Sequence, residues 1–169
     1  MTTELSIVVP CYNVGMYIEE CLASVLGYMD ETTELIIVND GSTDDTRNKI
    51  ANTIAGHQNK RIQVIDQKNK GISAARNTGL NASSGAWVSF LDSDDSYTEH
   101  FFDVFHKKIK YSSADLVEFD ANIIRSSGSP EYFSCSFLPT DNVNGSDTRF
   151  LLPVFRQAKW FTWSRIYKR

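Results

Sequence analysis

Short runs rich in apolar residues recur along the first half of the chain, and each is followed by a polar or glycine-containing segment. These runs are Leu5–Pro10, Glu34–Asn39, Arg61–Asp66 and Ala86–Leu91. The residues between them carry apolar side chains at helical spacing. Strands and helices that alternate with connections of this length form right-handed βαβ units. The sequence therefore predicts an α/β fold with a mainly parallel sheet covered by helices on both faces.

Apolar residues at helical spacing indicate three helices between these strands: Tyr17–Leu26, a segment ending at Ile54, and Ile72–Leu80. Ser42 or Thr43 is expected to cap the second helix, because a hydroxyl there accepts a hydrogen bond from a free backbone amide. Asp44 and Asp45 would then lie in its first turn, where the helix dipole favours acidic side chains.

The second half of the chain is less regular. We expect a helix near Glu99–Lys110, strands over Leu116–Ile124 and Tyr132–Leu138, and a helix over Ser146–Phe155. The last residues, Trp160–Arg169, are aromatic and basic. We expect them to pack internally, because large aromatic side chains bury much area; contact with a membrane surface is the alternative. No linker divides the 169 residues, which suit a single domain.

Composition excludes several classes of protein. The formal net charge is -4, from 17 basic and 21 acidic residues, so binding of nucleic acid by bulk electrostatics is not expected. No apolar run reaches the roughly 20 residues that span a bilayer. The N-terminus lacks a secretory signal, and the three cysteines form no CxxC pair, so we expect a cytoplasmic protein with reduced thiols. No GxGxxG or GxxxxGK[ST] motif is present.

An acidic cluster follows the last of the four runs. Asp92, Asp94 and Asp95 fall within four residues, and such carboxylates repel one another unless they are solvated or bridged by a cation. Hard divalent cations prefer oxygen ligands, so the cluster suits Mn²⁺ or Mg²⁺. The alternative is helix capping, because Ser96 and Glu99 fit a capping box before the next helix.

Two more candidates lie where ligands of open α/β sheets bind, beyond the carboxyl ends of the strands. Asp40 is either part of an ordinary Asp-Gly turn or a carboxylate that accepts the imide N–H of a base. Arg76 is either a solvated surface residue or, given its small neighbours, a guanidinium that pairs with phosphate. Cys11 lies beside these two residues. We do not expect it to be a nucleophile, because the sequence shows no histidine partner for it.

Together these segments resemble family 2 glycosyltransferases of the GT-A fold, in the order and at the spacing of that family. The resemblance covers about the first hundred residues, and a terminal stretch resembles the Trp-containing basic segment of capsule-type members. The matching segments are Ser6–Asn13, Glu34–Asp44, Asn69–Gly79, Phe90–Asp95 and Trp163–Arg169. Asn39 stands where many members have aspartate.

The resemblance implies a mixed, mainly parallel sheet and inverting transfer of a sugar from a nucleotide-sugar, usually a UDP-sugar, to an acceptor hydroxyl. The acceptor would be a saccharide or lipid-linked saccharide in cell-surface polysaccharide synthesis, which allows peripheral contact with the inner face of the plasma membrane. Asp94 would hold the Mn²⁺ or Mg²⁺, with Asp95 as the alternative ligand. The donor-binding residues carried over from the family are Pro10, Tyr12, Asn13, Asp40, Arg76, Asp92 and Asp95.

The general base of the family lies on an acidic segment that follows the Trp-containing stretch. No matching segment precedes Arg169, so we expect the base outside this chain and an incomplete catalytic domain. Residues 1–98 would form a nucleotide-sugar-binding half and residues 99–169 an acceptor-facing half. Two other functions stay open: an inactive nucleotide-sugar-binding module and a sugar-nucleotide nucleotidyltransferase. The latter usually has a glycine- and arginine-rich loop where this chain has Cys11–Asn13.

Overall fold

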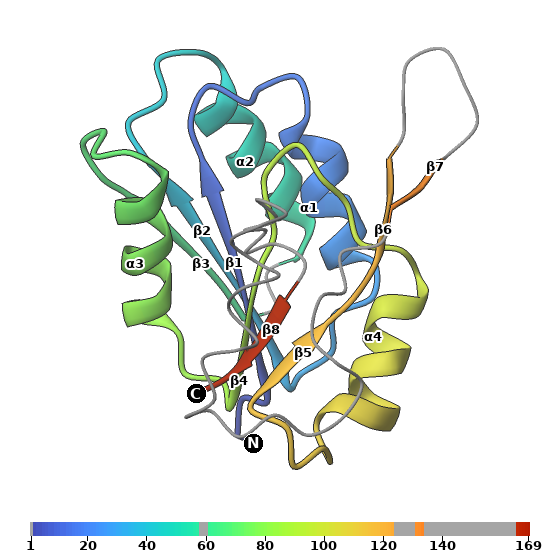
Figure 1. The fold of residues 1–169 in the computed structure, drawn as a ribbon. Helices are drawn as coiled ribbons and strands as arrows, with labels where there is room; N and C mark the ends of the chain where they lie inside the picture. Colours follow the sequence, from blue (N-terminus) through green and yellow to red (C-terminus); the bar gives the residue numbers. More distant parts are fainter. Residues whose placement is uncertain (1, 58–60, 124–130, 134–164) are drawn as a thin grey trace, which may run out of the picture.

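The computed structural model describes residues 2–57, 61–123, 131–133 and 165–169. Their main feature is a six-stranded sheet with the order β3-β2-β1-β4-β8-β5 (Figure 1). Strands β1 to β4 are parallel, whereas β8 runs antiparallel to both of its neighbours, β4 and β5. The predicted mixed, mainly parallel sheet is confirmed. The strand bounds are β1 Leu5–Cys11, β2 Thr33–Asn39, β3 Arg61–Asp66, β4 Trp87–Phe90, β5 Leu116–Glu118 and β8 Arg165–Lys168.

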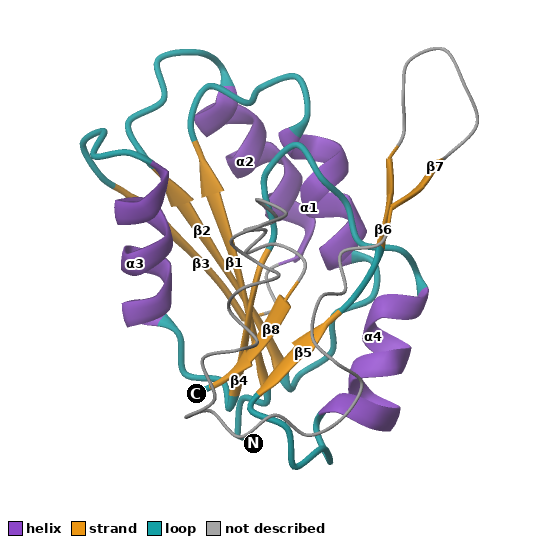
Figure 2. Ribbon diagram, in the orientation of Figure 1, coloured by secondary structure: helices purple, strands orange, loops and turns teal. Residues whose placement is uncertain are grey.

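Helices cover both faces of this sheet, as Figure 2 shows. Alternate residues of β1 point to opposite faces, because side chains alternate along a strand. Ile7 and Val9 belong to the core beneath α1, α2 and α4, whereas Val8 packs with Ala75 of α3 on the other face. The helical segments are α1 Ile18–Leu26, α2 Thr46–Ile54, η1 Ala55–His57, α3 Ile72–Ala82, α4 His100–Val104 and η2 Phe105–Ile109.

The close packing of α3 on the sheet depends on Gly79. A Cβ added at Gly79 would overlap with the side chain of Val8 in β1. Because glycine has no Cβ, it lets the helix lie closer to the sheet than any other residue would at this position. This approach brings the first turns of α3, which carry Arg76, close to the carboxyl ends of the strands.

The start of α2 differs from the sequence-based prediction. The helix begins at Thr46 with Asp45 as its N-cap, and neither Ser42 nor Thr43 caps it. Asp44 and Asp45 therefore precede the first turn. The physical reason is competition, because Ser42 and Thr43 form hydrogen bonds with the loop after β1 instead.

The predicted strand over Leu116–Ile124 is wrong as a single element. It forms two short strands, β5 and β6 (Ala121–Ile123), and β6 pairs with β7 (Glu131–Phe133) in a separate two-stranded sheet. The chain changes partners at Phe119, whose ring packs against Tyr97 and Phe101. The described start of the predicted strand Tyr132–Leu138 lies in β7.

The predicted helix near Glu99–Lys110 is confirmed as α4 and η2. The two form a continuous helical segment whose second part has wider, π-type turns, and the backbone N–H of Lys110 donates to the carbonyl of Phe105. The capping box predicted as an alternative for Ser96 and Glu99 does not form, because no side chain caps α4. The predicted helix over Ser146–Phe155 lies outside the described residues. None of the described helices is long and apolar enough to cross a bilayer.

The described end of the aromatic and basic tail packs internally, as predicted. Residues Arg165–Lys168 form β8 between β4 and β5, and Ile166 is fully buried in the core. Arg165 Nε lies 2.8 Å from Glu118 Oε1 of β5, and the two side chains are 10% and 6% exposed. The sheet thus joins strands from residues 1–98 with strands from residues 99–169.

Candidate donor-binding site

A cavity of about 560 Å³ opens where β1, β2 and β4 end. Ligands of open α/β sheets bind in this position. Five of the predicted site residues line it, and three do not: Asn13, Arg76 and Asp95. The lining residues are Pro10, Cys11, Tyr12, Val14, Asp40, Asn69, Gly71, Ile72, Ala75, Asp92, Ser93 and Asp94.

Asp40 is a buried carboxylate that organises the loop before α3. It directly follows β2, and 3% of the residue is exposed. Its Oδ1 accepts hydrogen bonds from Gln67 Nε2 (2.6 Å) and the Lys70 N–H (2.9 Å), and its Oδ2 accepts one from the Gly71 N–H (2.8 Å). Asp40 also belongs to an Asp-Gly turn, as the first alternative predicted, because Gly41 has a φ of 74°. Asp40 therefore serves the turn and faces the cavity with acceptor capacity left on Oδ2.

The end of β1 presents Pro10 to the cavity, and the loop after it presents Tyr12. Asn13 has a φ of 52°, in the left-handed region that asparagine tolerates. Its Oδ1 accepts a hydrogen bond from the Thr43 N–H at 2.8 Å, and its own N–H donates to Ser42 Oγ at 3.1 Å. Asn13 thus joins the β1 and β2 loops, and its contact with a nucleoside stays a prediction.

Arg76 does not line the cavity, but its Nη2 lies 2.6 Å from Oδ1 of Asp92, which does. The two side chains are 20% and 23% exposed. Among the described residues, Arg76 Nε is buried without a hydrogen-bond partner. A buried donor without a partner is costly. Arg76 therefore places a guanidinium, already paired with Asp92, next to a cavity-lining carboxylate, and a bond to its buried Nε–H would need a local rearrangement.

The acidic loop after β4 combines a paired carboxylate with two exposed ones. Asp94 lines the cavity, and neither Asp94 nor Asp95 forms a hydrogen bond or ion pair through its side chain within the described part of the chain. Desolvation, together with repulsion from Asp94 and Asp92, raises the pKa of Asp95 to about 6. Charge crowding of this kind is relieved by a cation.

The carboxylates of this loop fit a hard cation only in combination with a ligand. The described residues contain no group of three or more His, Cys, Asp or Glu side chains arranged to hold a metal ion. Mn²⁺ and Mg²⁺ prefer oxygen donors, and Mg²⁺ is commonly held by one or two carboxylates plus substrate phosphates. The exposed Asp94 carboxylate at the cavity supplies one such donor.

Cys11 lines the cavity, but its thiol is not a nucleophile. The residue is 1% exposed, and burial raises its pKa to about 12. The reactive species of a cysteine is the thiolate, which is scarce at such a pKa. Cys21 behaves in the same way, because burial raises its pKa well above the usual value.

Sequence reasoning missed part of the cavity wall. Val14, Asn69 and Ile72 line it, and Ile72 is 53% exposed. Val14 lies in the loop after β1 that holds predicted residues, whereas Asn69 lies in the loop after β3 and Ile72 begins α3, so the ends of β1 and β3 were the available signal. The apolar Val14 and Ile72 carry no chemistry that would mark them in a sequence.

The model for glycosyl transferase family 2 matches residues 6–147. This chain belongs to that family. It is 41% identical to the glycosyltransferase GlyA of Streptococcus pneumoniae, over 67% of this chain and 16% of GlyA.

Two solved structures show the same fold. Crystallised S. aureus TarS 1-349 in complex with UDP-GlcNAc has a TM-score of 0.74 and 23% identity, over 98% of this chain and 45% of that one. The mannosyltransferase PcManGT of Pyrobaculum calidifontis, in complex with GDP-Man and Mn²⁺, has a TM-score of 0.65 and 17% identity, over 100% of this chain and 45% of that one. The predicted GT-A fold is confirmed, and the chain spans less than half the length of each of these proteins.

Proposed function

We propose that this chain forms the donor-binding part of a glycosyltransferase that transfers a sugar from a UDP-sugar. The observation that carries this proposal is the meeting of four loops at one cavity. The loops follow β1, β2, β3 and β4, and they bring Tyr12, Asp40, Asn69 and Asp94 to a common wall. The family match favours a transferase over a nucleotidyltransferase.

The base and ribose of the donor would lie between Tyr12 and Asp40. Tyr12 is 49% exposed, so one face of its ring is available for stacking. Asp40 Oδ2 accepts one hydrogen bond and has capacity for another, which a uracil imide N–H would supply. Cytosine has no such N–H at that ring position, so this contact would select UDP over CDP donors.

The diphosphate would lie toward Arg76 and the acidic loop. Arg76 supplies positive charge, and Asp94 would hold Mn²⁺ or Mg²⁺ together with the phosphate oxygens. Such a cation stabilises the negative charge that develops on the departing nucleoside diphosphate. Asp95 is the alternative ligand.

The acceptor is proposed to be a saccharide or lipid-linked saccharide whose hydroxyl attacks with inversion. Its proton must pass to a general base. Asp40 already accepts three hydrogen bonds, and Asp92 is paired with Arg76. Neither carboxylate is therefore a good base, and we place that base outside the donor-binding loops.

Calorimetric titration with UDP, with and without Mn²⁺, tests this proposal. We expect Mn²⁺ to tighten binding of UDP by about tenfold or more. Asp94→Asn should remove this gain, whereas Asp115→Asn, which changes an exposed aspartate away from the cavity, should keep it. Loss of the gain in Asp95→Asn instead would move the ligand to Asp95. No binding of UDP with Mn²⁺ would contradict the proposed function.

A second experiment separates an active transferase from an inactive binding module. Nucleotide-sugars that bind the folded chain raise its melting temperature. A screen of UDP-, GDP- and CDP-sugars with Mn²⁺ should show the largest rise for one UDP-sugar, and slow hydrolysis of that donor would indicate transferase chemistry. A rise without hydrolysis or transfer, including in a longer chain, would support the binding module.

A further inference from the structure

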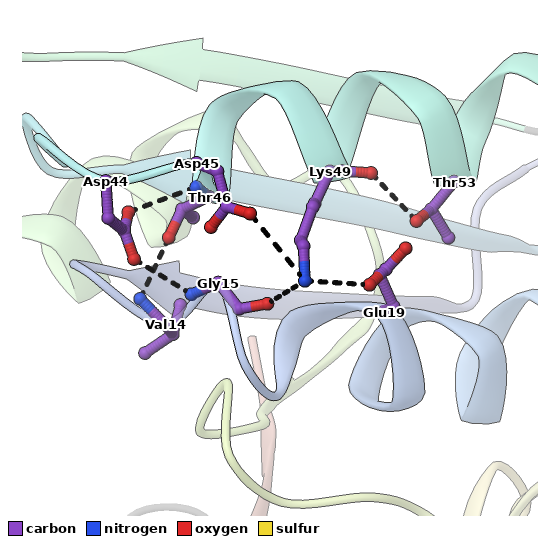
Figure 3. Close-up of polar contacts among 8 residues, drawn as sticks. All are labelled: Val14, Gly15, Glu19, Asp44, Asp45, Thr46, Lys49 and Thr53. Atoms are coloured by element: carbon purple, nitrogen blue, oxygen red, sulfur yellow. Dashed lines mark hydrogen bonds and ion pairs between the residues drawn. The ribbon is translucent and has the colours of Figure 1, made fainter.

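The loop after β1 is tied to the start of α2 by three side chains, Asp44, Thr46 and Lys49, which we name the clasp (Figure 3). The Val14 N–H donates to Thr46 Oγ1 at 2.8 Å, and the Gly15 N–H donates to Asp44 Oδ2 at 3.1 Å. Lys49 Nζ donates to the Gly15 carbonyl at 2.7 Å. All three bonds act on the backbone of the loop, so they fix its path.

Lys49 links this loop to two helices at once. Its ammonium lies 3.1 Å from Glu19 Oε2 of α1 and 3.8 Å from Asp45 Oδ2. The hydrogen bond to Glu19, together with the charge of Asp45, raises the pKa of Lys49. Lys49 therefore stays charged at neutral pH, and its ammonium joins Glu19, Asp45 and the Gly15 carbonyl.

The loop has little freedom to relax away from the clasp. Gly15 is buried, and a Cβ added there would overlap with the Asp45 carboxylate. On the other side of the loop, Asn13 Oδ1 accepts the Thr43 N–H at 2.8 Å. Residues 13 to 15 are thus held by the β2–α2 segment along their whole length.

The clasp acts on the donor site without forming part of it. Tyr12 and Val14 line the cavity, whereas none of Asp44, Thr46 and Lys49 does. A wall held by hydrogen bonds from a neighbouring helix is pre-organised for its ligand, which lowers the ordering cost of binding.

We propose that Lys49 is a positioning residue that holds the Tyr12–Val14 wall in its donor-binding conformation. This inference rests on the proposed binding of UDP at the cavity. Lys49 itself touches no donor atom, and its effect passes through the Gly15 carbonyl and the backbone of Val14.

Three variants test the inference. Lys49→Met keeps about the length of the side chain and removes its charge and its hydrogen-bond donors. Lys49→Arg keeps the charge and the donors. Lys107→Met is the matched control, because Lys107 also forms an i,i+4 ion pair, at 3.0 Å to Asp103, but lies on η2. We expect Lys49→Met to weaken binding of UDP with Mn²⁺ by about fivefold, as residues that act on a site without touching it do. Lys49→Arg should restore most of the affinity, and Lys107→Met should leave it unchanged.

Amide hydrogen exchange without ligand provides a readout that does not depend on UDP. In Lys49→Met, the amides of Val14 and Gly15 should exchange about threefold faster or more, because local opening governs exchange. The same amides in Lys107→Met should match those of the wild-type chain.

The outcomes separate the two proposals. If the wild-type chain binds UDP and Lys49→Met binds it equally well, the positioning role is wrong and the proposed function stands. Unchanged exchange at Val14 and Gly15 in Lys49→Met would also overturn the positioning role. Failure of the wild-type chain to bind UDP overturns the proposed function and this inference with it.

Discussion

The parallel strands β1 to β4 and the antiparallel strands β8 and β5 share one sheet but use charged residues differently. At the carboxyl ends of the parallel strands, Asp40, Asp92 and Asp94 line a cavity. In the antiparallel part, Glu118 and Arg165 pair with each other and are almost fully buried. In the first region Asp40 and Asp92 are bonded within the fold and the exposed Asp94 is not, whereas in the second region the two charges pair with each other.

Because of this difference, we expect substitutions in the two regions to have different effects on stability and on ligand affinity. Substitutions in the antiparallel pair should change stability and leave ligand affinity unchanged in the folded protein. Substitutions at the carboxyl ends of the parallel strands should change ligand affinity as well. A single sheet can carry both roles because its strands come from distant parts of the chain.

The largest expected effect is on stability, from Glu118→Leu. The substitution leaves the buried Arg165 guanidinium without this partner, and breaking a buried pair in this way costs about 3–5 kcal/mol. Urea unfolding measures the loss. The double variant Glu118→Leu/Arg165→Met should recover most of it, because it also removes the charge that the single variant leaves without its partner. A double variant as unstable as the single one would show that the pair has no such role.

A smaller effect on stability is expected from Asp40→Asn, and this substitution should also lower the affinity for UDP. The substitution places an amide N–H₂ against backbone donors, so we expect a loss of about 2 kcal/mol in the free energy of unfolding. UDP affinity should fall about tenfold, because the proposed imide contact loses its carboxylate. Asp115→Asn is the exposed control. Loss of stability with full UDP affinity would assign Asp40 to the fold alone.

The smallest effect concerns packing in the parallel region. Gly79→Ala should destabilise the chain by about 1–2 kcal/mol, because the new methyl group overlaps with the Val8 side chain. Gly56→Ala is the control, since a Cβ at Gly56 meets nothing within 4 Å. Thermal unfolding compares the two. Equal melting temperatures would show that α3 can move away from β1 at no cost.

The parallel region was predictable from the sequence because its signals are local. Strands β1, β2 and β4 are mainly apolar runs and β3 alternates, and each is followed by residues that parallel strands bring to one edge. Asp40 directly follows such a run and Asp94 lies close to the end of another, so their positions suffice to predict that both lie at one cavity.

Other features could not be predicted because they depend on contacts between distant residues. Ser42 and Thr43 have the chemistry of helix caps, but Asn13 engages both, and α2 begins at Thr46 instead. The break between β5 and β6 follows from the packing of Phe119 in an aromatic cluster. The same limit hid the contacts of Lys49 with Gly15 and Glu19, because a lysine among polar residues of a helix is typical of an ordinary solvated face.

The most direct test of the contrast between the two regions is a hydrogen-exchange map of UDP binding with Mn²⁺. We predict protection of the loops after β1, β2 and β4, at residues 12–15, 40–42 and 92–95, and no change in β5 and β8. This pattern would place the nucleotide at the carboxyl ends of the parallel strands. Protection centred on β5 and β8, with the three loops unchanged, would contradict the account.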